Sequence, residues 1–398
     1  MTVHQWHRTR LKYICDTNVA VLPDGTDQDF EFVYIDIGNV TQGRMVTDGK
    51  PIEFRNAPSR ARRLAKPGDT VVSTVRTYLR AVATVPPLEG VLVFSTGFAV
   101  LSPREEVDPR FLSWYLQGDE FVSRVEANST GVSYPAITAT QLVALDLRLP
   151  PLRTQRAIAD YLDRETARID TLLEEQQRLI EMLTERRSAA LIDAFASMHA
   201  ETPIVAREPI PWLPGLHAEQ AQMRHLCTIG TGSSDSANAV DEGYPFFVRG
   251  DQPLTLDTYE FDTEAIITAG DGAMVGRSFH HFRGKFAAHQ RVYVLRDFNR
   301  VFPRYVYWYF STFFIRVVGD GGAQATVPSV RMPMIASLPV PIPAYDEQRR
   351  IAAYLDARTA RIDALLSETE RFIELSRERR SALITAAVTG QIHLREVA

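Results

Sequence analysis

The residues that could contact a nucleic acid gather in two arginine-rich stretches of the chain. In the first stretch, five basic residues lie between Glu53 and Asp69 without an intervening acid. Arginine carries a planar set of donors that fits phosphate oxygens and the edge of guanine. A solvated loop is the usual explanation for one such stretch by itself, so the organisation of the whole chain must decide. The candidate DNA-binding residues in this stretch and just after it are Arg55, Arg60, Arg62, Arg63, Lys66, Arg76, Tyr78 and Arg80.

The second stretch, 272–295, also lacks acids and interleaves its basic residues with phenylalanines. Phenylalanines in such a pattern are typical of a core, whereas the basic residues favour a phosphate-binding loop. The adjacent histidines in this stretch favour a metal site only weakly, because no cysteine or carboxylate lies beside them. Two loops at matching places in the chain, 128–134 and 319–326, add further candidates. The candidate DNA-binding residues of this second group are Ser133, Tyr134, Arg249, Arg277, His280, His281, Arg283, Lys285, Gln290 and Arg291.

Motifs for catalysis are scarce in this sequence. Two Pro-Pro pairs, at 86–87 and 150–151, lack the preceding Asp or Asn and the following aromatic residue of an adenine methyltransferase. Asp36 with Asp48 and Lys50 loosely matches the carboxylate and lysine set of a metal-dependent nuclease, but Asp-Gly is a turn signal between strands. We therefore expect no catalytic residue and no metal site, and keep a stand-alone metal-dependent DNA nuclease as an alternative.

Length and composition limit the class of protein. The 398 residues exceed what one hydrophobic core usually supports, so we expect at least two domains. A net charge of −5 excludes a generally basic nucleic-acid coat and confines any DNA contact to local patches. Two cysteines cannot form a disulfide framework, and charged and polar residues interrupt the most apolar stretch, 301–318. We expect a cytoplasmic protein with no membrane partner.

An internal repeat decides the organisation of the chain. The segment 155–189 reads QRAIADYLDRETARIDTLLEEQQRLIEMLTERRSA, and the segment 348–382 reads QRRIAAYLDARTARIDALLSETERFIELSRERRSA. Of these 35 aligned positions, 23 are identical, and the offset of 193 residues is close to half the chain. The sequence is therefore a tandem duplication.

Each copy of the repeat is predicted to form one long helix. Apolar residues recur at steps of three, four and seven, which is typical of one face of a helix in a coiled coil. No glycine or proline interrupts Arg153–Met198 or Asp346–Thr389, and a proline-rich segment precedes each of them. The residues expected to contact the partner helix are Leu162, Ile169, Leu172, Leu179, Leu355, Ile362, Leu365 and Phe372.

The segments before the two helices are of similar length and of a different character. They are rich in β-branched and aromatic residues with glycine turns, and they echo each other faintly, as at 110–116 and 304–310. Two similar halves can pack about a pseudo-two-fold axis, which makes the helices antiparallel. We expect an α+β protein of two mixed α/β domains joined by an antiparallel helical coiled coil. The expected boundaries are 1–148 for the first domain, 149–199 for the first helix, 200–340 for the second domain and 341–398 for the second helix.

The repeat motifs carry a resemblance to a known family. Each copy has a proline entry followed by Gln-Arg-x-Ile-Ala-x-Tyr-Leu-Asp, at 155–163 and 348–356, and then Thr-Ala-Arg-Ile-Asp and Glu-Arg-Arg-Ser. A Pro-Gly-Asp strand entry at 67–69 and an aromatic helix in each domain accompany them. On these motifs the whole chain resembles the specificity subunit of Type I restriction–modification systems.

This resemblance implies a function without chemistry in the chain itself. Each domain would be a target-recognition domain that reads one half of a bipartite, asymmetric site in double-stranded DNA, and the helices would set the spacing. The resemblance further implies two methyltransferase subunits docked on this non-catalytic subunit, and motor-nuclease subunits bound through them. S-adenosylmethionine, ATP and magnesium would belong to those partners, and this chain would bind no cofactor. A coiled-coil scaffold that binds only protein remains a further alternative, which the two basic domains disfavour.

Overall fold

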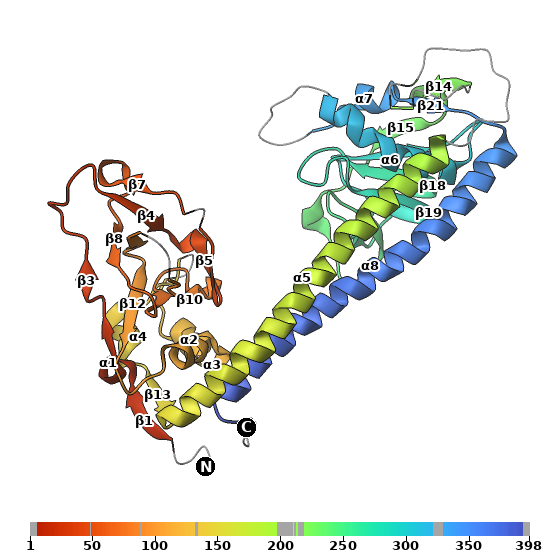
Figure 1. Ribbon diagram of the computed structural model, residues 1–398. Helices are drawn as coiled ribbons and strands as arrows, with labels where there is room; N and C mark the ends of the chain where they lie inside the picture. The colour runs from red at the N-terminus through yellow and green to blue at the C-terminus, as the bar shows by residue number, and fades with distance from the viewer. Residues whose placement is uncertain are drawn as a thin grey trace. The chain divides into compact units, whose positions relative to one another are not determined.

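The computed structural model describes residues 6–47, 49–87, 90–131, 134–196, 210, 212–213, 219–320 and 329–392. The chain forms two compact units, a first unit of Met1–Gln177 with Arg371–Ala398 and a second unit of Arg178–Glu370. Each unit contains one β-rich part and a portion of both long helices, α5 (Leu152–Ala196) and α8 (Tyr345–Val388), as Figure 1 shows. We call the β-rich parts the first head (7–149) and the second head (220–341).

The first head is built mainly from two sheets with strand orders β10-β9-β12-β2 and β3-β8-β11-β4-β7. Strand β11 pairs parallel with β4 and antiparallel with β8, while β9 pairs antiparallel with β12. Strands β4, β9 and β11 therefore end, and β8 begins, at one edge, which we call the loop edge of the first head. The elements are β1 (His7–Arg10), α1 (Leu11–Ile14), β2 (Cys15–Thr17), β3 (Ala20–Val21), β4 (Glu31–Ile35), β5 (Val40–Thr41), β6 (Arg44–Met45), β7 (Ile52–Glu53), β8 (Ala61–Leu64), β9 (Thr70–Ser73), β10 (Val82–Thr84), β11 (Leu92–Ser95), β12 (Phe98–Pro103), α2 (Pro109–Gln117), α3 (Asp119–Ala127), α4 (Ala139–Ala144) and β13 (Asp146–Leu149).

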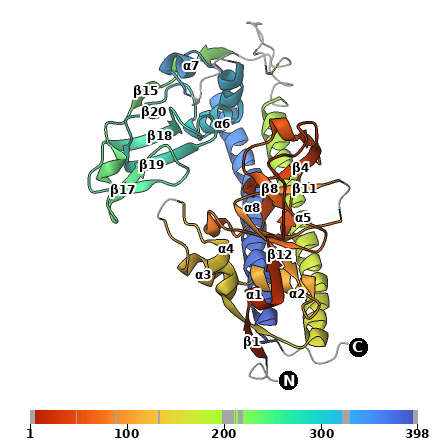
Figure 2. The same cartoon turned by 90° about the vertical axis from the view of Figure 1, so that its left-hand side faces the viewer.

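The second head repeats this topology in one six-stranded sheet of order β15-β20-β18-β19-β16-β17. Strands β15, β20, β18 and β19 lie side by side in this order, as Figure 2 shows. Strand β16 pairs parallel with β19, and β18 pairs antiparallel with β20, as β4 with β11 and β9 with β12 do in the first head. The loop edge of the second head is where β16 and β18 end and where the turn 289–291 leads into β20. The elements are β14 (Gln220–Gln222), β15 (Thr228–Thr231), β16 (Tyr244–Phe247), β17 (Leu254–Leu256), β18 (Phe261–Ala269), β19 (Phe279–Ala288), β20 (Val292–Arg296), α6 (Pro303–Asp320), α7 (Met332–Ala336) and β21 (Pro339–Pro341).

The two long helices run antiparallel, as the duplication predicts. The first part of α5 lies in the same unit as the last part of α8, and the second unit combines the other two parts. Ion pairs join them in each unit, between Arg380 and Asp170 and between Arg187 and Asp363. These two pairs are equivalent in the repeat, so the same contact joins the two helices in each unit. None of the helices that the structure describes is long and apolar enough to cross a membrane.

The buried seam of α8 differs from the predicted one at two positions. Leu355 and Ile362 are buried as expected, but Leu365 and Phe372 are 43% and 40% exposed. Polar residues occupy the seam instead, and Thr369 is only 6% exposed there. Its hydroxyl donates to the carbonyl of Leu365 at 2.7 Å, so the polar group is satisfied inside the helix. The prediction placed Leu365 and Phe372 in the seam because they are large and apolar, but they lie on the stripe of the helix beside it.

Each head shares its hydrophobic core with both long helices. In the first unit, Leu162 of α5 and Ile384 of α8 pack in one core with α2 and α3. In the second unit, Leu355 of α8 and Phe195 of α5 pack in one core with α6. All four of these helix residues have no exposed surface. Among the described residues, each head therefore packs against both long helices through a shared core.

We expect Leu355→Ala to lower the free energy of unfolding by about 2–5 kcal/mol, because it removes a completely buried side chain and leaves a cavity. The matched control, Leu365→Ala on the same helix, should change it by no more than about 0.5 kcal/mol. Urea unfolding of the full chain, followed by circular dichroism, measures both. An equal loss in the two variants would show that Leu365 belongs to the seam after all.

Candidate nucleic-acid interface

Candidate residues from separate parts of the first head meet at its loop edge. Arg60 directly precedes β8, and its carbonyl accepts the N–H of Thr96, in the turn between β11 and β12, at 2.8 Å. Arg60 is held by two neighbours, with Nη2 2.6 Å from Asp36 Oδ2 and Nε 3.0 Å from the Tyr34 hydroxyl. Its side chain is nevertheless 56% exposed. Arg60 is thus an oriented guanidinium at the surface of this edge.

The loop after β9 lies at the same edge in a strained conformation. Arg76 and Arg80 have φ values of +50° and +52°, in the left-handed region that non-glycine residues rarely adopt. The 3-10 turn between them, η4 (Thr77–Leu79), leaves Tyr78 52% exposed. The Arg76 guanidinium lies over the ring of Tyr134, 5.1 Å from its centroid. Arg76 and Tyr134, which come from two different loops, therefore present a guanidinium and an aromatic ring together.

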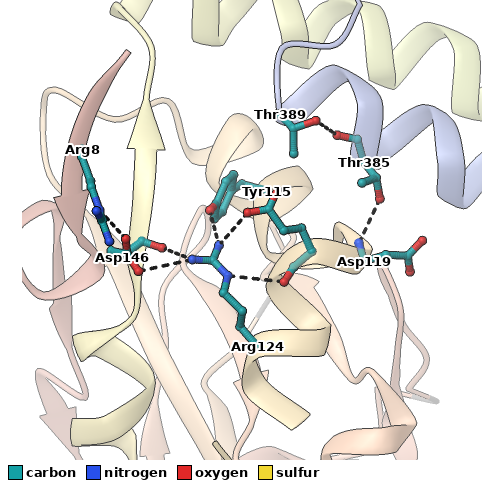
Figure 3. A network of polar contacts seen from close by, with 8 residues as sticks. Arg8, Tyr115, Asp119, Arg124, Asp146, Thr385 and Thr389 are labelled. Carbon is teal, nitrogen blue, oxygen red and sulfur yellow. Dashed lines mark hydrogen bonds and ion pairs between the residues drawn. The ribbon is translucent and has the colours of Figure 1, made fainter. Parts of the chain in front are cut away.

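A carboxylate at the start of α3 ties this loop to the long helix α8. Arg80 Nη1 donates to Asp119 Oδ1 at 2.5 Å, and the Ser381 hydroxyl donates to Asp119 Oδ2 at 2.7 Å. The Asp119 N–H donates to the Thr385 hydroxyl at 2.9 Å, as Figure 3 shows. Arg80 therefore positions the loop, and only the N–H groups that Asp119 leaves free can face a ligand.

The same corner of the first unit is held by a second arginine network (Figure 3). Arg124 Nη1 donates to the Asp146 carbonyl at 2.6 Å, and Nη2 donates to the Tyr115 hydroxyl at 2.7 Å. Arg8 Nε donates to Asp146 Oδ2 at 2.6 Å, and this bond lowers the pKa of the Asp146 carboxyl. The network links β1, β13, α2 and α3, so it fixes the base of the first head.

Four predicted DNA-binding residues of the first head lie away from its loop edge. Strand β8 runs away from that edge, so Arg62 and Arg63 lie along it and Lys66 lies beyond its far end. Arg55 follows β7, whose partner residues stand at the start of β4, which is the opposite end from the loop edge. Strand direction thus separates residues that are close in the sequence. Ser133 lies outside the described residues.

The loop edge of the second head carries a compact group of candidates. Gln290 and Arg291 form the turn between β19 and β20, and Arg249 follows β16. Arg249 and Arg291 both pair with Asp271, which follows β18, at 3.1 Å and 2.7 Å. Arg277 is exposed in the loop between β18 and β19. Three loops therefore bring polar side chains to one place.

The two predicted histidines have different surroundings. His281 is only 15% exposed, and its Nε2 lies 2.9 Å from Glu264 Oε1 and its Nδ1 lies 3.4 Å from Arg304 of α6. His280 shares a hydrogen bond with the Ser278 hydroxyl at 3.1 Å. Burial lowers the pKa of both rings, so both are neutral at pH 7. His281 is turned toward α6 and its ring is largely covered, and its DNA contact stays a prediction.

Arg283 and Lys285 lie on β19 opposite Glu264 and Asp262, at the end of the β18–β19 pair that is remote from the loop edge. The Lys285 ammonium lies 4.6 Å from the centroid of the Tyr259 ring, and the Tyr259 side chain raises the pKa of Lys285. These two residues therefore do not join the group around Arg291.

Among the described residues there is neither a metal-binding cluster nor a reactive thiol. No group of three or more His, Cys, Asp or Glu among them could hold a metal ion. Burial raises the pKa of Cys15 and Cys227 to about 12, so neither thiol is a nucleophile at neutral pH. Asp48, which belongs to the nuclease-like set of the sequence, lies outside the described residues.

Sequence reasoning missed the residues that join each head to its helices. In the first unit, the Trp114 indole N–H donates to Asp163 Oδ1 at 2.8 Å, and Arg110 Nη1 donates to Asp163 Oδ2 at 2.9 Å. In the second unit, Trp308 donates to Asp356 at 2.8 Å, and an arginine at the matching position pairs with the same carboxylate. These residues occupy equivalent positions in the two halves. Their recurrence in both halves of the sequence could have identified them as functional.

An arginine from the other long helix covers each tryptophan. Arg380 of α8 lies 5.8 Å from the centroid of the Trp114 ring, and its Nε donates to Asp170 of α5 at 2.8 Å. Arg187 of α5 lies 5.9 Å from the centroid of the Trp308 ring and pairs with α8 in the same way. Each tryptophan therefore contacts both long helices.

A buried glutamine completes each junction. Gln155 is 1% exposed, and its Nε2 donates to the carbonyls of Pro150 and Glu106 at 2.9 Å and 3.1 Å. Its Oε1 accepts the N–H of Asp108 at 2.9 Å. Gln348 is completely buried and makes the three matching bonds, at 2.9, 3.3 and 2.7 Å. The proline entry, the head and the helix are thus held by one side chain in each half.

Comparison with known proteins agrees with the duplicated architecture. The sequence profile of the Type I restriction modification DNA specificity domain matches residues 28–182 and 219–374. The specificity subunit of the Type I restriction enzyme EcoDI from Escherichia coli is 28% identical over 185 residues, which are 46% of this chain and 39% of that protein. The corresponding StySPI subunit from Salmonella potsdam is 26% identical over 146 residues, which are 35% of this chain and 31% of that protein. The chain thus matches less than half the length of these relatives.

Solved structures share the fold along nearly the whole chain. A chain from a study of complex assembly and conformational transition in the type I R-M system is 23% identical, with a TM-score of 0.73 over 97% of this chain and 98% of its own. The HsdS subunit from Thermoanaerobacter tengcongensis is 24% identical, with a TM-score of 0.50 over 97% of each chain. Since the specificity-domain profile covers most of the chain in two copies, the protein belongs to the family of Type I restriction–modification DNA specificity domains.

Proposed function

We propose that this protein is the DNA-recognition subunit of a Type I restriction–modification complex, and that each head reads one half of a bipartite, asymmetric site. The observation that carries this proposal is the pair of loop edges. Each loop edge gathers exposed arginines from several loops. The two heads are joined to their helices by equivalent contacts. The two edges carry different side chains, which accounts for two unlike half-sites.

Catalysis in such a complex belongs to other subunits. We infer that methyltransferase subunits carry S-adenosylmethionine, that motor-nuclease subunits use ATP and magnesium, and that the complex works in the cytoplasm. The family match supports this division of labour. A stand-alone nuclease is the competing function, and it requires magnesium-dependent cleavage by the purified chain.

Deletion of the gene should abolish one split adenine-methylation motif in the source strain, because the heads choose the site for the methyltransferase. A base-resolution methylation map with and without the gene measures this and supplies both half-sites. Replacing the second head by a related one should then change one half of the motif and leave the other half intact. Loss of both halves in that exchange would rule out independent heads.

Arg76→Ala should weaken DNA binding by the assembled complex and reduce the slope of log affinity against log salt by about 1, as expected for one lost phosphate contact. Arg55→Ala is the matched control, because Arg55 lies at the opposite end of β4 and pairs with Asp29 and Glu53. Titration of labelled duplex at several salt concentrations measures both variants. Equal losses in the two variants would contradict the assignment of the loop edge as the interface.

The long helices carry two equivalent apolar patches for partner docking. Phe372 and Leu375 of α8, in the first unit, are 40% and 52% exposed. The repeat places Leu179 and Met182 of α5 at the equivalent positions in the second unit, and Met182 is 59% exposed. Neighbouring exposed apolar side chains on otherwise charged helices are candidates for a protein interface. Two equivalent patches fit two copies of one methyltransferase subunit.

Replacing both Phe372 and Leu375 by Asp should remove one of two methyltransferase copies, because it puts charges into one apolar patch only. Native mass spectrometry of the co-expressed complex measures the number of copies. Ser367→Asp, which adds a charge at an exposed polar position of α8, is the control. Retention of both copies by a folded double variant would exclude this patch from the docking surface.

A further inference from the structure

The loop edge of the second head contains an arrangement of two arginines on one carboxylate. Asp271 Oδ1 lies 3.1 Å from Arg249 Nη1, and Oδ2 lies 2.7 Å from Arg291 Nη1. The Asp271 side chain is 20% exposed, whereas those of Arg249 and Arg291 are 47% and 61% exposed. The carboxylate is therefore largely covered, and both guanidinium groups stay open to solvent on their other N–H groups.

The backbone on either side of the carboxylate is fixed. The Gly270 N–H donates to the Arg291 carbonyl at 2.9 Å, and the Gly270 carbonyl accepts the N–H of Val330 at 2.7 Å. A Cβ at Gly270 would lie 2.8 Å from the Arg291 carbonyl oxygen, so glycine is needed for this close approach. Asp271 itself forms a bridge with Ser329. The backbone contacts thus fix the position of the carboxylate to which the two arginines bind.

The turn that carries Arg291 is fixed as well. The Arg291 N–H donates to His289 Nδ1 at 3.0 Å, and the Gln290 N–H donates to the Ser234 carbonyl at 3.1 Å. Burial lowers the pKa of His289, so its ring stays neutral and can accept this bond at pH 7. The backbone of Arg291 is therefore positioned by His289, and its guanidinium is positioned by Asp271.

An exposed ion pair of this kind adds at most about 1 kcal/mol to stability, so stability does not explain a two-arginine arrangement. One carboxylate between two guanidinium groups leaves one positive charge, which suits a polyanion. A guanidinium with a fixed plane also fits guanine, whose O6 and N7 accept two parallel N–H bonds in the major groove. Arg291 is the more exposed of the two and stands at the tip of a turn.

We propose that Arg291 reads a guanine in the half-site of the second head, and that Asp271 is the positioning residue that holds its guanidinium in the plane of that base. This inference rests on the proposed function and names one base class that it recognises. Arg249 supports the arrangement from the other side of the carboxylate.

The test selects bound duplexes from a random DNA library with the assembled complex and compares wild type with Asp271→Asn and Arg291→Lys. Both variants should lose preference for guanine at one position of one half-site, by roughly 5- to 150-fold, because the bidentate contact is lost or disoriented. The other half-site should be selected as before. Asp297→Asn is the matched control, because Asp297 pairs with Arg296 in the same head at the end of β20, and it should keep every preference.

Two outcomes would overturn the inference. If both variants bind all sequences more weakly by the same factor, Arg291 contacts a phosphate and reads no base. If folded variants keep every base preference, Arg291 lies outside the interface. Arg291→Lys retains the positive charge and is the variant to trust if Asp271→Asn melts at a lower temperature. Failure of the proposed function itself would look different, since the wild-type complex would then select no split motif.

Discussion

A buried amide at the start of each long helix is the constraint on which the rest of the structure depends. Gln155 and Gln348 each satisfy three backbone groups that would otherwise be buried without partners. A buried polar group of this kind tolerates only one arrangement of its neighbours, since each unmade bond costs on the order of 1–3 kcal/mol. The direction in which a head leaves its helix is therefore set locally, at the first turn of the long helix.

The tryptophan and arginine contacts extend this constraint to the second helix of each pair. The Trp114 indole donates a hydrogen bond to a carboxylate of α5, and its ring lies under Arg380 of α8. One side chain therefore contacts both helices. The junction around Trp308 repeats this with the helices exchanged. The contacts between head and helices are thus the same in the two halves, whereas the side chains at the loop edges have diverged. This pattern agrees with the proposed function, in which each head reads its own half-site.

Much of the fold could be predicted from the sequence, because the repeat is strong and the helical periodicity is long. The antiparallel pairing and the β-rich heads follow from symmetry and from apolar patterning. The seam was predicted less well, since Thr369 is buried while Leu365 is exposed. A threonine can be buried when its hydroxyl bonds the preceding turn, and apolarity does not reveal this.

The candidate site was harder to predict, because it is assembled by strand direction. Arg55 and Arg60 are five residues apart in the sequence, yet they fall at opposite ends of β4, since the chain reverses through β7 and β8. Conversely, Arg249 and Arg291 are distant in sequence and share one carboxylate. His281 looked like part of a basic loop, but its place in β19 points it at α6. The strand pairing decides which of these residues lie at the loop edge, and a count of charges in the sequence does not.

The contact between Asp119 and Ser381 bears on how such proteins can evolve. The repeat gives α5 an equivalent serine, Ser188, although the residue at the Asp119 position of the second head is Phe313, which is completely buried. A head that carries the aspartate would therefore meet a serine on whichever helix it was joined to. Recombination could move a head from one half of the gene to the other, or between strains, without rebuilding its support. New site combinations would then arise by shuffling and not by the slow accumulation of point changes.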